Sequence, residues 1–203
     1  MDYLKYEELL EELIAENDII RSEDMKVVGI PITYASRMVD KGKLVKLERG
    51  VYAMSYQYYD KYYLFQQKNQ AAIFSFVSAL YLHDLVDSFP YDIDVTVYSG
   101  YNTHRFPSIV KPHYIKKELH ELGKIEVTTR MGNKVYCYDK ERTICDLIAN
   151  RKKIDAEIFT SALRNYMQSN DKKIETLYEY AEKMGIEEKV KEIVEVLYEY
   201  KKE

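Results

Sequence analysis

Two groups of side chains in this sequence could do chemistry, and they indicate different kinds of function. The first group contains carboxylates and imidazoles: Asp92 and Asp94, one residue apart, and the adjacent His83 and Asp84. Paired aspartates hold catalytic metal ions in many enzymes that act on phosphate esters. The second group contains hydrogen-bonding and cationic side chains between residues 31 and 54, which are suited to binding a polyanion such as nucleic acid.

The motifs that would support a reaction are incomplete. A restriction-type nuclease needs Glu-x-Lys on a following strand, but Glu126 is followed two residues later by Thr128. A nucleotidyltransferase needs Gly-Ser before its aspartates, but an aspartate precedes Ser88. The sequence also contains no P-loop, no GxSxG nucleophile motif and no HExxH zinc motif. We therefore predict no catalytic residues, no metal site and no cofactor.

The remaining histidines and cysteines do not change this prediction. His104 and His113 lack the cysteines or carboxylates that would complete a metal site. Cys137 and Cys145 form no CxxC pair, and we expect buried thiols in a reducing cytoplasm. No run of 18 apolar residues occurs, and the acidic, amphipathic N-terminus is unlike a secretory signal. We expect a cytoplasmic protein that does not enter a membrane.

The stretch from residue 31 to residue 54 predicts a short amphipathic helix, a stop at Gly42 and a tight basic hairpin. On a helical wheel one side is apolar, with Tyr34, Ala35, Met38 and Val39. The other side is polar, with Thr33, Ser36, Arg37, Asp40 and Lys41. This order is typical of the recognition helix and wing of a winged helix-turn-helix. The alternative is an ordinary solvated helix beside an ordinary hairpin.

The pattern predicts which side chains would contact double-stranded DNA. Residues of the helix would lie at or near base edges in the major groove: Thr33, Tyr34, Ser36 and Arg37. Residues of the turn and wing would contact phosphates: Lys41, Lys43, Lys46 and Arg49. Tyr34 differs from the other members of this set, because the helical wheel turns it toward the apolar side.

The net charge of −4 does not by itself indicate a nucleic-acid partner, but positive charge is concentrated in two segments. Residues 26–52 contain six Lys or Arg against two acids, and residues 102–134 contain seven against three. The second segment adds candidate DNA contacts at Arg105, Lys111, Lys116 and Lys117. The alternative is that these cations are scattered over the surface.

Hydrophobic periodicity predicts the elements that position the first group of cations. Residues 3–16 predict an amphipathic helix, whose acidic face would be repelled by phosphate and whose role is therefore that of scaffold. A short helix follows at residues 22–28, and Gly29-Ile30-Pro31 makes the turn into the recognition helix. With the hairpin, these elements predict a winged helix-turn-helix domain at residues 1–55.

Residues 56–203 predict a second domain with both helices and strands. Residues 69–85 are apolar nearly all round, which predicts a central buried helix. Beyond Pro90 the period changes to two and predicts strands, the first of them with one buried face. Asp139 is expected to cap a helix, and three amphipathic helices follow, at residues 155–168, 172–183 and 187–200. The predicted fold class is α+β: an N-terminal winged helix-turn-helix, then a small, mainly antiparallel sheet with C-terminal helices.

The order of four motifs resembles that of the AbiEi-type antitoxins of bacterial abortive-infection, type IV toxin–antitoxin systems. The motifs are LVKLERGVYAM (Leu44 to Met54), SALYLHDL (Ser78 to Leu85), DIDVTV (Asp92 to Val97) and YDKERTICDLI (Tyr138 to Ile148). The resemblance spans roughly residues 5 to 170.

This resemblance implies a transcriptional autorepressor that binds inverted repeats in its own operon promoter. It further implies an antitoxin that counters a nucleotidyltransferase-like toxin, without a stable complex, in a system that protects bacteria against phage. Arg142, Thr143 and Asp146 of the fourth motif would then belong to a surface needed for toxin neutralisation. The alternative is structural, with Thr143 and Asp146 bonding helix N-terminal amides and Arg142 pairing with a strand carboxylate.

Two further predictions concern assembly and the competing function. No long heptad repeat is present, so we expect a monomer that pairs on DNA. The main alternative function is a winged-helix transcriptional regulator whose C-terminal domain binds a ligand or a protein and has no toxin partner.

Overall fold

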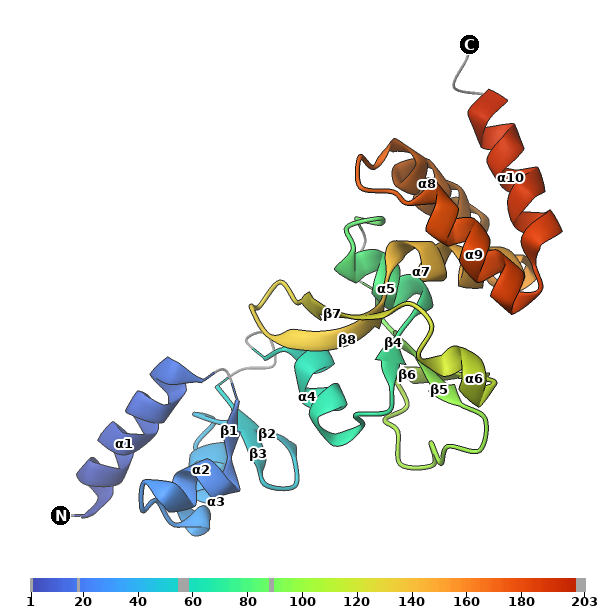
Figure 1. Ribbon diagram of the computed structural model, residues 1–203. Coiled ribbons are helices and arrows are strands. Elements are labelled where there is room, and N and C mark those ends of the chain that lie inside the picture. Colours follow the sequence, from blue (N-terminus) through green and yellow to red (C-terminus); the bar gives the residue numbers. More distant parts are fainter. Residues whose placement is uncertain (1, 18, 55–58, 88–89, 200–203) are drawn as a thin grey trace. The chain divides into compact units, whose positions relative to one another are not determined.

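The computed structural model describes residues 2–17, 19–54, 59–87 and 90–199, and it contains two compact units (Figure 1). The first unit comprises Met1–Leu64 and the second Phe65–Glu203, so the division falls within helix α4 (Lys61–Lys68). The predicted domain boundary between residues 55 and 56 lies outside the described residues. None of the described helices is both long enough and apolar enough to cross a membrane.

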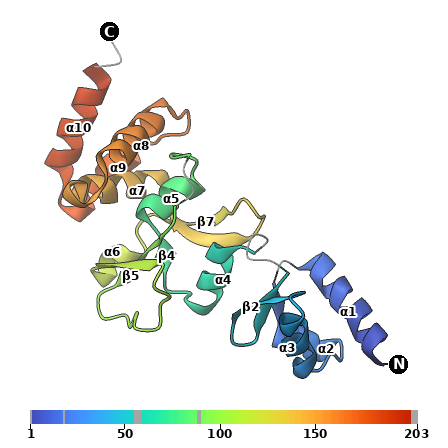
Figure 2. The ribbon, with the colours of Figure 1, turned by 180° about the vertical axis from the view of Figure 1, so that it is seen from behind.

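The first unit has the order of elements of a winged helix-turn-helix, as the sequence predicts. Its elements are α1 (Asp2–Glu16), β1 (Ile20–Arg21), α2 (Ser22–Val27), α3 (Ile32–Asp40), β2 (Val45–Glu48) and β3 (Val51–Ala53). The three strands form an antiparallel sheet in the order β1-β3-β2. Helices α2 and α3 lie side by side next to this sheet in both views (Figures 1 and 2). The hairpin β2–β3 is the wing.

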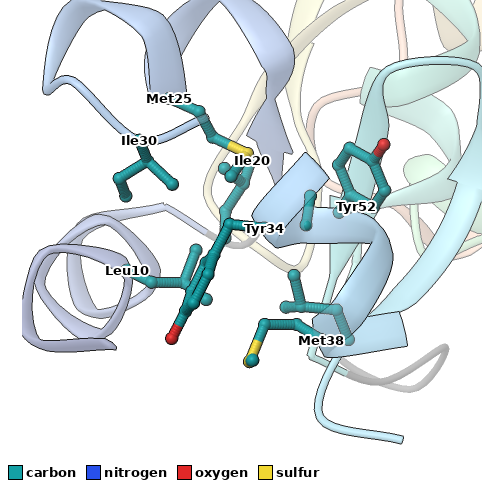
Figure 3. Packing of buried hydrophobic residues seen from close by; sticks show 9 residues of the cluster. Leu10, Ile20, Met25, Ile30, Tyr34, Met38 and Tyr52 are labelled. Atoms are coloured by element: carbon teal, nitrogen blue, oxygen red, sulfur yellow. The ribbon is translucent and has the colours of Figure 1, made fainter. Parts of the chain in front are cut away.

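A single apolar cluster holds these elements together. Its buried members are Leu10, Ile20, Met25, Ile30, Tyr34, Ala35, Met38, Leu44 and Tyr52, which come from all three helices, the segments between them and the sheet. Figure 3 shows the ring of Tyr34 beside Leu10 of α1, with Met25 and Ile30 across the cluster. Because α3 buries one face here, its other face is fixed toward solvent.

The second unit is built around a five-stranded sheet. Its strands are β4 (Ile73–Phe74), β5 (Ile93–Tyr98), β6 (Val110–Ile115), β7 (Lys124–Thr128) and β8 (Lys134–Tyr138), in the order β6-β5-β4-β8-β7. The pairs β4–β5 and β7–β8 are antiparallel, whereas β4–β8 and β5–β6 are parallel. The α+β class is confirmed, but the sheet is mixed rather than mainly antiparallel. The reason is β6, a strand that the sequence analysis did not predict, and the crossover that returns β8 to β4.

The apolar stretch at residues 69–85 is not one helix, as predicted, but a strand followed by a short helix. Ile73 and Phe74 form β4 in the middle of the sheet and are fully buried. The chain then turns at Ser75 into α5 (Phe76–Leu82). A central strand is apolar on both faces, so it lacks the alternation that would separate it from a buried helix.

Strand β5 was predicted to bury one face, but both faces are buried. Asp94 and Thr96, on the face predicted to be solvated, are only 8% and 3% exposed. The Oδ1 of Asp94 lies 2.7 Å from His113 Nε2, and the hydroxyls of Thr96 and Ser75 lie 2.9 Å apart. Ser78 Oγ in α5 accepts from the backbone N–H of Asp94 at 2.8 Å. These hydrogen bonds make burial of polar side chains tolerable.

The helical elements of the second unit after β6 are α6 (Lys117–His120), α7 (Lys140–Ala149), the 3-10 turn η2 (Arg151–Lys153), α8 (Ala156–Gln168), α9 (Ile174–Met184) and α10 (Glu187–Glu199). The four helices predicted after Asp139 are present as α7 to α10, whereas α6 and the 3-10 turn η2 were not predicted. Asp139 caps α7 as predicted, accepting from the backbone N–H of Arg142 at 2.8 Å. Figures 1 and 2 both show α8, α9 and α10 gathered beyond α7 and away from the sheet.

Candidate nucleic-acid interface

Helix α3 presents a polar face to solvent. Pro31 precedes its first turn, where the absence of an N–H costs nothing and the fixed φ favours helix entry. Tyr34, Ala35 and Met38 are buried beneath it. The side chains exposed on the other face are Thr33, Ser36 and Arg37, which are three of the four residues predicted to meet base edges.

Tyr34 is the fourth, and its predicted contact with DNA is wrong. The side chain is only 3% exposed, and its ring packs on that of Tyr6 in α1 with centroids 5.6 Å apart. Burial raises the pKa of its hydroxyl, and the nearby Glu7 carboxylate adds to this increase. Tyr34 therefore joins the recognition helix to α1 and does not face a ligand.

The turn after α3 is closed by a complete Schellman motif. The N–H of Gly42 donates to the carbonyl of Val39, and the N–H of Lys43 donates to that of Met38, both at 2.9 Å. Gly42 has a φ of +69°, which this motif requires. The motif holds Lys41 and Lys43 on the surface at the end of the recognition helix.

The wing is fixed to the helix-turn-helix at its tip. Arg49 and Gly50 form the turn between β2 and β3, and the carbonyl of Gly50 accepts from both the backbone N–H of Ser22 (2.8 Å) and its hydroxyl (3.2 Å). Lys46 on β2 and Arg49 at the tip are exposed. Within the described side chains, no carboxylate pairs with Lys41, Lys46 or Arg49.

Lys43 differs from the other three predicted phosphate contacts. Its Nζ donates to the carboxylate of Glu7, which lies on α1. This hydrogen bond lowers the pKa of Glu7 and raises the pKa of Lys43. The acidic face of α1 was predicted to be scaffold only, and the role of Glu7 was not predicted, because no local pattern relates residues that are 36 positions apart.

The second basic segment is mostly neutralised by its own unit. Four of its seven cations form ion pairs with carboxylates: Lys111 with Asp92, Lys124 with Glu121, Arg130 with Asp84, and Lys134 with Glu126. The remaining three are Arg105, Lys116 and Lys117, which are exposed and have no carboxylate partner among the described residues. Because Lys111 is already paired with Asp92, the predicted DNA contacts that remain in this segment are Arg105, Lys116 and Lys117.

Arg142, Thr143 and Asp146 do not lie on a surface, and the predicted toxin-neutralising surface at these residues is wrong. Their exposed fractions are 0%, 0% and 4%. The guanidinium of Arg142 donates to the carbonyls of Leu119 (2.8 Å) and Leu122 (2.7 Å). It also pairs with Asp146 at 3.2 Å and lies over the ring of Tyr138.

The alternative, a structural role for these three residues, was correct, but their predicted partners were wrong. The helix amide is capped by Asp139, and the hydroxyl of Thr143 donates to the carbonyl of Asp139 at 2.7 Å. Arg142 pairs within α7, with Asp146, and not with a strand carboxylate. Hence this motif (Tyr138 to Ile148) lies in the interior of the second unit. Through Arg142 it links the start of α7 to the carbonyl groups of Leu119 and Leu122.

Aspartates and histidines that were considered as catalytic or metal-binding residues make contacts within the protein instead. The Oδ2 of Asp92 lies 2.5 Å from Lys111 Nζ, and the Oδ1 of Asp94 lies 2.7 Å from His113 Nε2. His113 also stacks on Phe76, with ring centroids 4.0 Å apart. The described residues contain no group of three or more His, Cys, Asp or Glu that could hold a metal ion.

Of the other candidate nucleophiles and bases, His83 is partly buried and the two cysteines are fully buried. His83 Nε2 lies 2.6 Å from the carbonyl of Tyr138, and burial lowers the pKa of this imidazole. Both cysteines are free thiols, and burial raises the pKa of Cys145 to about 12 and that of Cys137 well above its ordinary value. A thiol with a raised pKa is not the reactive thiolate form at neutral pH.

The fold and the exposed groups of the first unit define a winged helix-turn-helix domain with a polar recognition face and a cationic turn and wing. Comparison with protein families shows what this domain is similar to. Residues 7–55 match the family described as "Transcriptional regulator, AbiEi antitoxin". The resemblance to AbiEi-type antitoxins is therefore confirmed, and the part of the chain that carries the match is the winged helix-turn-helix.

One solved structure extends the comparison to the second unit. The chain is similar in fold to the RV2827C protein from Mycobacterium tuberculosis, with a TM-score of 0.61 over 86% of this chain and 70% of that chain. The sequence identity is 14%, so this similarity shows a shared fold alone. No curated protein sequence matches the chain.

Proposed function

We propose that this chain is a DNA-binding transcriptional autorepressor and antitoxin, which binds inverted repeats in the promoter of its own operon. The observation that carries the proposal is the match of residues 7–55 to transcriptional regulators described as AbiEi antitoxins. The same residues contain the exposed polar face of α3 and the exposed cations beside it.

In the first unit, α3 and the cations beside it would contact different parts of the DNA. Helix α3 would enter the major groove, with Thr33, Ser36 and Arg37 at or near base edges. Lys41, Lys46 and Arg49 would contact phosphates on either side of the groove, with Arg49 able to reach an adjacent minor groove. We infer that two monomers pair on the two half-sites of the operator.

The antitoxin part of the proposal concerns the second unit. It would counter a nucleotidyltransferase-like toxin without forming a stable complex, in a cytoplasmic type IV system that protects bacteria against phage by abortive infection. The family description supports the antitoxin role. The alternative is a regulator whose second unit binds a ligand or protein with no toxin partner; the family match covers residues 7–55, in the first unit.

A gel shift on the promoter of the chain's own gene tests the DNA-binding part. The wild-type chain should retard this duplex more strongly than a scrambled duplex of equal length. Arg37→Ala should cost about 1–3 kcal/mol of binding free energy and relax preference at one base position. Lys5→Ala, at an exposed cation on α1, should have little effect. A loss for Arg37→Ala that is equal on all duplexes would make Arg37 a phosphate contact.

A rescue assay tests the antitoxin part. The full chain, expressed with the nucleotidyltransferase-like protein encoded next to its gene, should restore bacterial growth. The Arg37→Ala variant should rescue equally when both proteins are expressed from foreign promoters, because neutralisation is assigned to the second unit. If the chain retards its promoter but rescues no neighbouring gene product, the regulator without a toxin partner is the better description.

A further inference from the structure

The turn that follows the recognition helix contains a cation that is already neutralised by the protein itself. Lys43 lies directly after the Schellman motif, and its Nζ donates to the carboxylate of Glu7 on α1. Both side chains are accessible to solvent, at 54% for Lys43 and 36% for Glu7. The pair therefore lies on the surface and has no evident role in filling the core.

The surroundings of Glu7 place this carboxylate among groups assigned to DNA binding. Lys41, at the end of α3, adds to the lowering of the Glu7 pKa, and Glu11 on the next turn of α1 adds to the raising of the Lys43 pKa. Glu7 thus lies near two cations of the turn. In contrast, no carboxylate among the described side chains pairs with Lys46 or Arg49 of the wing.

We propose that Glu7 limits the affinity of this protein for DNA by holding Lys43 in an ion pair and by placing a negative charge beside the phosphate-binding turn. The proposal rests on the DNA-binding function proposed above. A phosphate that approaches Lys43 must displace Glu7 or accept its repulsion. Because a phosphate contact carries no sequence information, this competition lowers the affinity for any duplex.

Removing the charge of Glu7 should change both the affinity for DNA and its salt dependence. Removal of the Glu7 charge frees Lys43, so that one more phosphate is neutralised when DNA binds. An exposed ion pair is weak, and the gain in affinity should therefore be modest, about threefold to fivefold at low salt. The logarithmic salt dependence of binding should become steeper by about 0.9, the value for one additional phosphate.

The experiment compares the full-length wild-type chain with Glu7→Gln and with Glu12→Gln. Glu12 is an exposed residue of the same helix, so its variant carries the same change in net charge without disturbing Lys43. Each protein is titrated at several salt concentrations against the operator duplex and a scrambled duplex. We expect Glu7→Gln alone to bind more tightly with the steeper slope, and its gain to be a similar factor on both duplexes.

Lys43→Gln completes the test as a double-mutant cycle. In the wild-type background it should leave the salt slope unchanged, whereas in the Glu7→Gln background it should abolish the gain. Equal affinities and slopes for Glu7→Gln and Glu12→Gln would overturn the inference while leaving the proposed function intact. A wild-type chain that does not prefer its operator would overturn both. Thermal unfolding of every variant shows whether the fold is retained.

Discussion

Arg142 and Asp146 form an ion pair one helical turn apart in the interior of the second unit, where their side chains are 0% and 6% exposed. Removing two charges from water costs free energy, which is offset when the charges attract each other and their remaining groups are bonded. Here Nη1 of the guanidinium donates to the carbonyls of Leu119 in α6 and Leu122 in the α6–β7 turn. In contrast, Arg142 Nη2 and Asp146 Oδ2 have no hydrogen-bond partner among the described residues. Loss of either partner would leave a buried, uncompensated charge, so the pair is a structural determinant of this unit.

The protonation of Asp146 should make the stability of the second unit depend on pH. Burial raises the pKa of this carboxyl to about 6, against the opposing effect of Arg142. Because the folded chain holds the proton more tightly than the unfolded chain, this contribution to stability is present below about pH 4 and is lost as pH rises through about 6. The free energy of unfolding of wild type, relative to Asp146→Asn, should fall by about 3 kcal/mol between pH 4 and pH 7.

Urea unfolding at several pH values measures this difference. Asp87→Asn, at an exposed aspartate, serves as the control for loss of one surface carboxylate. A wild-type curve that stays parallel to that of Asp146→Asn over this pH range would show that the buried carboxyl does not titrate there.

At the scale of elements, the wing depends on the contact between its tip and the start of α2. Gly50 has a φ of +77°, and a Cβ atom added to it would lie 2.9 Å from the Ser22 hydroxyl oxygen. The same hydroxyl donates to the carbonyl of Gly50. This turn therefore requires glycine both for its backbone conformation and for the space that a side chain would occupy.

Gly50→Ala should destabilise the first unit more than Gly42→Ala. Gly42 has a similar φ of +69°, but its added Cβ would meet nothing within 4 Å. We expect about 1 kcal/mol for the backbone strain at residue 42 and about 2–3 kcal/mol at residue 50, where the Ser22 contact is also broken. Thermal unfolding of the two variants measures this order. Equal losses of stability in the two variants would mean that the contact between Gly50 and Ser22 does not stabilise the first unit.

The elements differ in how well local sequence specifies them. Amphipathic helices such as α1, α3 and α8 were predicted closely, because one apolar face and one polar face produce a period that a wheel detects. The strand β4 was predicted as helix, and β6 was not predicted. A two-residue central strand carries no period of its own, and its identity is fixed by pairing with β5 and β8.

At the scale of the whole molecule, the question is whether the second unit adds to the DNA footprint. Arg105, Lys116 and Lys117 are the cations of residues 102–134 that lack a carboxylate partner among the described residues. We propose that these three, rather than the whole basic segment, contact phosphates. A cation that is already paired gives little net release of counterions when it meets DNA.

The double variant Lys116→Gln, Lys117→Gln should therefore reduce the salt slope of operator binding by about 1.8, since each lost phosphate contact contributes about 0.9. The matched control is Lys124→Gln, Lys134→Gln, which changes net charge equally but removes cations that are paired with Glu121 and Glu126. Titrations of the full-length proteins over a range of salt concentrations measure both slopes. If the two double variants behave alike, only the first unit contacts DNA.

The sequence alone determined the helix and hairpin at residues 31–54 and the polar face of that helix, because helical period, a glycine stop and hairpin residues are local signals. It also determined the α+β class and the helix cap at Asp139. Only the tertiary structure decided that Tyr34 and Arg142 are buried, and that Lys43 is paired with Glu7 while none of the described carboxylates pairs with Lys46. Burial and ion pairing depend on residues that are distant along the chain, and no local pattern records which of them meet.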